Sequence, residues 1–279
     1  MGGFALPSIL LSLSLVFLTA CSSRQDVAKS IAFPAGFSAD IIASPTFHIF
    51  TYSRLSPRHP VLTVYIEGDG YAWASANRVS DDPTPKDPVA LRLAAQDPSP
   101  SVAYVARPCQ YVTDTRRRGC SPAYWANGRF APEVIEAEAA AIRTLMARAG
   151  ATRLRVVGYS GGAAVALLLP RYGVHPDSII TVAGVLDPTA WVRLHELSPL
   201  VGSLDPVDTA AAVANTRQVH FVGGNDQVVP AAIAQSHGRR IATDAAMSII
   251  TVPGYTHECC WSENWLRLLR EAEAKLGVQ

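Results

Sequence analysis

The sequence predicts an α/β fold in which a mostly parallel central sheet carries helices on both faces. Short apolar runs typical of buried strands alternate along the chain with helical stretches, and this alternation favours parallel pairing through crossover helices. The chain has 279 residues, enough for one sizeable domain with a buried core. The sequence contains no internal repeat and no low-complexity tract. We therefore expect a single domain over residues 39–279.

The first half of this domain is expected to begin with strands. Strand-like apolar runs occupy residues 40–44, 46–52, 61–66 and 102–106. The first two lie close enough in the chain to form a hairpin. A proline- and aspartate-rich stretch leads into a short helix at residues 89–94. Pro132 then opens a longer helix with one apolar face, which Gly150 ends.

Four more strand-like runs lie in the second half of the chain. They occupy residues 154–157, 178–184, 218–222 and 247–252. Each run leads into a turn that carries a polar side chain able to take part in catalysis. In chain order, these side chains are Ser160, Asp187, Asp226 and His257.

A Gly-Tyr-Ser-Gly-Gly motif at residues 158–162 lies where the strand at 154–157 becomes an apolar, helix-like stretch. A tight strand-to-helix turn holds a serine hydroxyl exposed, and glycines relieve the clashes that a Cβ would make there. The turn also aims backbone N–H groups toward an oxygen that becomes negative. The pattern predicts Ser160 as a nucleophile. The alternative is a glycine-rich turn without a chemical role.

A serine nucleophile needs a base and a group that orients the base. His257 lies on a turn after the last strand-like run, whereas the other histidines fall within a strand or in polar and loop contexts. Asp226 lies on a Gly-Gly-Asn-Asp turn at the end of the preceding strand. Asp187, one strand earlier, is a rival for the acid. The order along the chain is therefore serine, acid, histidine.

These motifs, in their strand contexts, resemble the α/β-hydrolase superfamily over most of the chain after about residue 60. The resemblance implies an α/β-hydrolase fold in which Ser160 attacks, His257 transfers the proton and Asp226 fixes the histidine tautomer. The turn at residues 223–230 is similar to the usual acid turn of the superfamily, which favours Asp226. Some members carry the acid at the position of Asp187, so this alternative stays open.

The resemblance also implies an oxyanion hole built partly from the loop after the strand at residues 61–66. This loop reads Glu-Gly-Asp-Gly, and Glu67 stands where relatives usually carry histidine. The implied donors are the backbone N–H groups of Asp69 and Gly161, with Gly70 as the alternative to Asp69. The Asp69 carboxylate would oppose a developing oxyanion unless it turns away or is paired. A plain glycine turn is the other interpretation of this loop.

The N-terminus is typical of a targeting segment. An apolar core at residues 9–18 is too short to span a bilayer and suits a signal peptide. It ends in Leu-Thr-Ala-Cys, which resembles the lipobox of bacterial lipoproteins, where cleavage precedes an acylated cysteine. We expect a signal peptide at residues 1–20, lipidation of Cys21 and a tether over residues 21–38. The resemblance implies a bacterial cell envelope protein, with Ser22 compatible with an outer-membrane anchor facing the periplasm. An ordinary secretory signal is the alternative.

Charge limits the partners of the protein. The chain carries 24 basic and 23 acidic residues, so no strong positive field is available for nucleic acid. The only dense basic run, residues 116–118, is expected to be a solvated loop or a contact with anionic lipid headgroups. No stretch after Cys21 has the length and purity of a transmembrane helix, so we expect a soluble, tethered domain.

Four cysteines follow the lipobox: Cys109, Cys120, Cys259 and Cys260. An even number in an oxidising compartment predicts disulfides, but three pairings are possible and the sequence does not choose among them. No CxxC or histidine-rich spacing favours a metal site. Two long connections, residues 107–130 and 187–215, carry aromatic side chains such as Trp191 that are expected to line the substrate pocket or to pack beneath the loops.

Together these observations predict a monomeric, membrane-tethered serine hydrolase that cleaves small-molecule or lipid carboxylic esters through an acyl-enzyme, without a cofactor. Esterase, lipase and lysophospholipase activity fit the sequence equally well. Acyl transfer or peptidase action would use the same residues. A non-catalytic envelope lipoprotein that kept the fold as a binding module is the alternative from another class.

Overall fold

The computed structural model describes residue 2 and residues 23–57, 59–240 and 247–277. The predicted signal peptide and Cys21 lie outside the described residues, apart from Gly2. Within the described ranges, none of the helices combines the length and hydropathy that crossing a bilayer requires.

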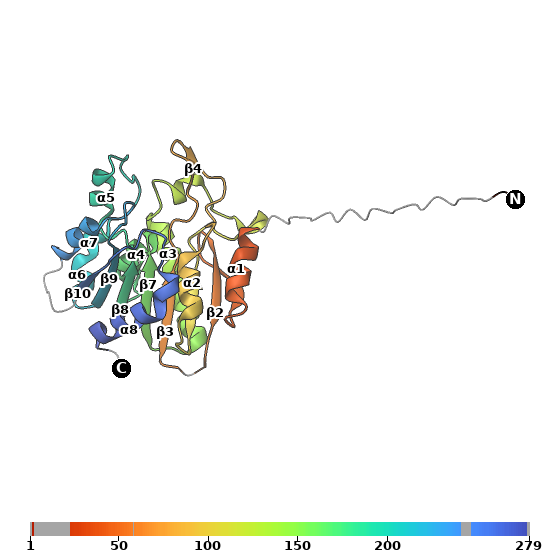
Figure 1. The fold of residues 1–279 in the computed structure, drawn as a ribbon, viewed down its shortest axis with the longest axis horizontal. Coiled ribbons are helices and arrows are strands. Elements are labelled where there is room, and N and C mark those ends of the chain that lie inside the picture. The colour runs from red at the N-terminus through yellow and green to blue at the C-terminus, as the bar shows by residue number, and fades with distance from the viewer. Residues whose placement is uncertain (1, 3–22, 58, 241–246, 278–279) are drawn as a thin grey trace.

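An eight-stranded sheet forms the centre of the molecule, with the strand order β1-β2-β6-β3-β7-β8-β9-β10 (Figure 1). Its strands are β1 Ser38–Ala43, β2 His48–Arg54, β3 Val61–Ile66, β6 Val102–Val105, β7 Arg153–Tyr159, β8 Ser178–Val182, β9 Arg217–Gly223 and β10 Met247–Val252. β2 pairs antiparallel with β1 and β6, and all other neighbours pair parallel. The predicted mostly parallel sheet is confirmed.

Helices cover both faces of this sheet, as predicted (Figure 1). The helices are α1 Arg24–Ala32, α2 Val89–Gln96, α3 Pro132–Ala149, α4 Gly161–Leu168, α5 Pro188–Leu194, α6 Ala210–Val213, α7 Ala231–Gly238 and α8 Trp265–Leu276. One apolar cluster joins α1, α2 and α8 to one face of the sheet. A second cluster joins α3, α4, α6 and α7 to the other face. The central strands are therefore buried on both sides, which explains their continuous apolar runs.

The prediction of a tether over residues 21–38 is wrong for residues 24–32, which form helix α1. Ser23 and Asp26 form a capping box that starts this helix. Ala28 and Ala32 are fully buried in the cluster that α1 shares with α2. The signal missed in the sequence is the Ser-x-x-Asp cap before a helix whose apolar face consists mainly of alanines.

Two buried histidines, His220 on β9 and His237 on α7, lie next to each other. Their ring centroids are 5.6 Å apart, and Nδ1 of His220 lies 2.8 Å from the Thr181 hydroxyl. Burial lowers the pKa of His220 well below its ordinary value and lowers the pKa of His237 to about 4. Both side chains are therefore neutral in the folded protein near pH 7.

We expect this pair to make the fold sensitive to acid. An unfolded histidine titrates near 6.5, so below that pH the unfolded chain binds protons that the folded chain does not. The free energy of unfolding should fall by up to about 1.4 kcal/mol per pH unit for each histidine as the pH drops from about 6.5 toward 4. In urea unfolding at pH 7, 6 and 5, the free energy of unfolding of His237→Leu should fall less from pH 7 to pH 5 than that of the parent. The exposed control His175→Gln should follow the parent, and a His237→Leu curve parallel to the parent curve would contradict the prediction.

Candidate active site

Ser160 lies on the turn between β7 and α4, as the motif predicts. Its backbone has φ 50° and ψ −118°, a conformation that few non-glycine residues adopt and that raises the side chain above the sheet edge. The turn is possible because the flanking residues lack a Cβ. A Cβ on Gly158 would lie 2.6 Å from the Cα of Ala163, and one on Gly162 would collide with the carbonyl of Ile66. The close packing of this turn therefore requires glycine at positions 158 and 162.

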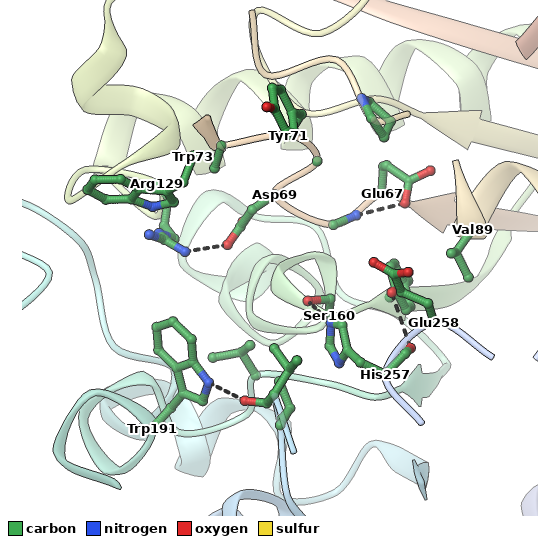
Figure 2. Close-up of a pocket in the computed structure, with 18 of the residues that line it drawn as sticks. Glu67, Asp69, Tyr71, Trp73, Val89, Arg129, Ser160, Trp191, His257 and Glu258 are labelled. Carbon is green, nitrogen blue, oxygen red and sulfur yellow. Dashed lines mark hydrogen bonds and ion pairs between the residues drawn. The ribbon is translucent and has the colours of Figure 1, made fainter. Parts of the chain in front are cut away.

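The structure brings the three predicted side chains together at the carboxyl ends of β7, β9 and β10. Nε2 of His257 lies 3.0 Å from Oγ of Ser160, and Nδ1 lies 3.0 Å from Oδ2 of Asp226 (Figure 2 shows Ser160 and His257). With Asp226 ionised, Nδ1 carries the proton and donates to the carboxylate. Nε2 is then free to accept the proton of the Ser160 hydroxyl. An unbroken hydrogen-bond chain thus runs from acid to nucleophile.

Each end of this chain is fixed by further contacts. The other carboxylate oxygen of Asp226 accepts from the backbone N–H groups of Val228 and Val229, both at 2.8 Å. The carbonyl of His257 accepts from the Tyr159 hydroxyl at 3.2 Å and from the Trp261 indole at 2.9 Å. Because these contacts restrain both the acid and the histidine loop, the imidazole is held in one orientation.

Asp187, the rival acid, has a different role. Its carboxylate caps α5 by accepting from the N–H of Ala190 at 2.8 Å and also accepts from the Ser236 hydroxyl at 2.6 Å. The carboxylate bonded to His257 belongs to Asp226. The geometry therefore decides between the two acids that the sequence left open.

The Asp69 carboxylate is paired rather than free. It lies 3.0 Å from Nη1 of Arg107 and 2.6 Å from Nη1 of Arg129. The second pair is visible at the pocket wall in Figure 2. Arg107 also contacts Glu138 at 2.6 Å, and burial raises the pKa of Glu138 to about 7 although Arg107 opposes this shift. Two arginines thus compensate the charge that would oppose an oxyanion near Asp69.

The predicted oxyanion donors lie beside Ser160. The Asp69 carboxylate packs against the Cα of Gly161, so a Cβ there would collide with it. Gly161 begins α4, so its N–H points out of the first helical turn. Within the described part of the chain, the backbone N–H groups of Asp69 and Gly161 donate no hydrogen bond. Both donors are therefore available to a ligand.

Glu67 ties the oxyanion loop to the start of α2. Its buried carboxylate accepts from the N–H of Gly68 at 3.0 Å and from that of Ala90 at 3.3 Å. Burial raises its pKa to about 7. From the other side, the Gln110 amide donates to the carbonyl of Gly68 at 3.1 Å. The residue that departs from the superfamily pattern thus supports the loop, a role the sequence analysis did not find.

Two disulfides lie close to these loops. Cys109 pairs with Cys120, and Cys259 pairs with Cys260. The cross-link between the two pairs, which the sequence left open, is absent. The Cys109–Cys120 bond closes the loop that presents Gln110 to the oxyanion loop.

A cavity of about 840 Å³ opens above Ser160 (Figure 2). Its apolar side chains include Trp73, Val185, Trp191, Leu197, Leu200, Val228 and Val229, and its polar ones include Lys86, Asp87, Asn127, Arg129 and Glu258. Trp191 of the connection 187–215 lines the wall, as expected, whereas the connection 107–130 supplies Asn127 and Arg129 and none of its aromatic side chains. The short hairpin of β4 (Trp73–Ser75) and β5 (Arg78–Val79) was not predicted, and the available signal was a lone tryptophan, Trp73, among small residues. In the described ranges, no group of three His, Cys, Asp or Glu side chains is arranged to hold a metal ion.

The sheet order, the strained serine turn and the position of the histidine loop together define the α/β-hydrolase fold. Among solved structures with this fold, a serine hydrolase without a lid from Xanthomonas campestris aligns with a TM-score of 0.52 and 13% identity, over 86% of this chain and 94% of its own. A candidate lipase from Acinetobacter baumannii aligns with a TM-score of 0.56 and 12% identity, over 90% and 97%.

A puromycin-hydrolysing peptidase from Mycobacterium tuberculosis aligns with a TM-score of 0.60 and 16% identity over 89% of this chain. The match covers 40% of that larger peptidase. No protein-family model and no curated protein sequence matches this chain. At these identities the likeness establishes the fold alone.

Proposed function

We propose that this protein is a serine hydrolase that cleaves carboxylic esters through an acyl-enzyme intermediate. The observation that carries the proposal is the hydrogen-bond chain from Asp226 through His257 to Ser160, with 3.0 Å at each step. This series of hydrogen bonds ends at Ser160, below a cavity large enough for a small or lipid ester. The lidless serine hydrolase among the structural neighbours is compatible with this activity.

In the proposed reaction, Oγ of Ser160 bonds to the ester carbonyl carbon while its proton moves to Nε2 of His257. Asp226 stabilises the imidazolium without taking its proton. The carbonyl oxygen becomes negative and accepts from the N–H groups of Asp69 and Gly161. The bond from carbon to the alkoxy oxygen then breaks, and the alcohol leaves with the proton from Nε2. Water repeats these steps on the acyl-enzyme and releases the acid.

We also propose that Cys21 anchors the protein in the bacterial envelope, in the outer membrane and facing the periplasm. The support is the lipobox-like sequence that ends in Cys21, followed by Ser22. Acylation by more than one chain would hold the protein stably, because each buried methylene contributes about 0.8 kcal/mol and a single chain is marginal.

One crossed labelling experiment tests both parts of this proposal. Full-length protein in cells is treated with a fluorophosphonate probe and with an alkynyl palmitate. We expect Ser160→Ala to lose the first label and keep the second, and Cys21→Ala to show the opposite pattern. Ser198→Ala, a matched change at a serine in the pocket wall, should keep both.

The outcomes separate the two parts of the proposal. Fluorophosphonate labelling of Ser160→Ala at the parent level would rule out Ser160 as the nucleophile. Palmitate labelling of Cys21→Ala at the parent level would rule out the lipid anchor. Parent protein that is labelled at Ser160 but cleaves amide substrates far faster than p-nitrophenyl esters would favour peptidase action.

A further inference from the structure

Exposed apolar side chains gather around the mouth of the pocket. In the described part of the chain the exposed large hydrophobic residues are Phe33, Trp73, Leu194, Leu197, Val201, Val228 and Leu266. Three of these line the pocket: Trp73, Leu197 and Val228. Leu194 ends α5 and Val201 lies on the segment that follows, so the two flank Leu197 in the chain, and Val201 is 73% exposed. We call these five residues the mouth rim.

The mouth rim comes from two sides of the pocket. Trp73 stands on the β4–β5 hairpin, and the others belong to the α5 segment and the turn after Asp226. β4 and α5 both project beyond the same end of the sheet, above the carboxyl ends of its parallel strands (Figure 1). A ring of exposed apolar groups around a polar site marks a surface that contacts a partner or a membrane.

The N-terminal helix begins at this same end of the molecule (Figure 1). Nη1 of Arg24 donates to the carbonyls of Asp82 and Thr84, both at 2.9 Å, and its guanidinium lies 4.7 Å from the ring of Tyr71. Tyr71 lines the pocket, as do the residues directly after Thr84. The first turn of α1 is thus attached to the pocket wall.

Cys21 precedes Arg24 by three residues, and three residues of fully extended chain span about 10 Å. Any lipid attached to Cys21 is therefore held within a short distance of the pocket wall. The basic run at residues 116–118 lies nearby, because Arg117 donates to the carbonyl of Asp81 at 3.0 Å. The exposed side chain of its neighbour Arg116 can contact anionic headgroups there.

From this arrangement we propose that the mouth rim docks on the lipid bilayer that holds Cys21, so that the pocket receives ester substrates directly from the membrane. This inference rests on the proposed ester hydrolysis and on the proposed lipid anchor. The anchor limits the distance between the pocket and the bilayer, and the mouth rim turns the pocket toward the bilayer. An acyl chain can then move from the bilayer past Leu197 and Val228 toward Ser160 without crossing water.

The test uses full-length protein in vesicles of phosphatidylethanolamine and phosphatidylglycerol. The rim variants are Leu194→Asp and Val201→Asp, which carry no pocket-lining change. The matched controls are Phe33→Asp, after the end of α1, and Leu266→Asp, on α8. We expect each rim variant to hydrolyse a long-chain ester in the vesicles about tenfold more slowly than the parent, because a charge resists insertion among lipids. All four should hydrolyse p-nitrophenyl acetate in solution at the parent rate.

A second measurement reports docking without catalysis. Phospholipids brominated on the acyl chain should quench part of the tryptophan fluorescence of the parent, and Trp73→Phe should remove that part. Unchanged quenching in Trp73→Phe, or vesicle rates in the rim variants equal to those in the controls, would overturn the docking. Parent protein that docks on the vesicles but cleaves no ester would contradict the proposed ester hydrolysis and leave the docking intact. Parent protein that binds a protein partner through the rim and leaves the brominated lipids without effect would assign this surface to that partner.

Discussion

Replacing Asp226 by asparagine is expected to lower kcat for ester hydrolysis by about 10⁴-fold while leaving the protein folded. An amide keeps the size of the carboxylate and one oxygen that can accept from the N–H groups of Val228 and Val229. It cannot stabilise the imidazolium, and its NH₂ group favours the tautomer in which Nδ1 is unprotonated and accepts a hydrogen bond. Nε2 of His257 would then carry a proton and could not take the one from Ser160.

Asp187→Asn is the matched control for this change. Asp187 is as deeply buried as Asp226 and caps α5, and asparagine is an equally good cap. Measured with a p-nitrophenyl ester under saturating conditions, Asp187→Asn should keep most of the parent kcat. Equal losses in both variants, with intact unfolding curves, would mean that Asp226 does not act as the acid of the triad.

The sequence was sufficient for the positions of Ser160 and His257 and limited the acid to Asp226 or Asp187, because each of these residues follows a strand at its carboxyl end. Parallel strands bring these ends to one edge of the sheet, so residues up to 97 positions apart in the chain meet there. Local pattern and topology together therefore determine the triad geometry. Only the choice between Asp187 and Asp226 needed coordinates, because both residues satisfy the same local pattern.

The contacts of Arg107 and Arg129 with the oxyanion loop could not be predicted in the same way. Arg107 and Arg129 reach Asp69 from 38 and 60 residues away, out of a connection with little regular structure. Such contacts depend on how a loop folds back over the sheet, and no periodicity encodes that path. The same holds for the pairing of Cys109 with Cys120, which depends on the course of the same connection. Sequence patterns place side chains on strands and helices well, but they do not give the path of a long loop.

The pairing of Asp69 with both arginines leads to the second large effect. The carboxylate is held at two oxygens, and Glu67 and Gln110 hold the backbone of the preceding residue, Gly68. Because the side chain of Asp69 is clamped, its own N–H is held in a fixed direction. We expect this preorganisation to stabilise the oxyanion, since a donor that must reorient during the reaction contributes less.

Asp69→Asn is therefore expected to lower kcat by about 10²-fold with little change in KM, because the amide accepts from one arginine but not from both. The affinity for a trifluoromethyl ketone, whose adduct carries an oxyanion, should fall by a similar factor. Asp40→Asn removes an exposed pair with Arg148 and is the matched control; it should change neither value. Denaturant unfolding of both variants separates stability from catalysis. If Asp69→Asn unfolds more easily yet keeps the parent kcat and inhibitor affinity, the two arginines serve the fold and not the oxyanion.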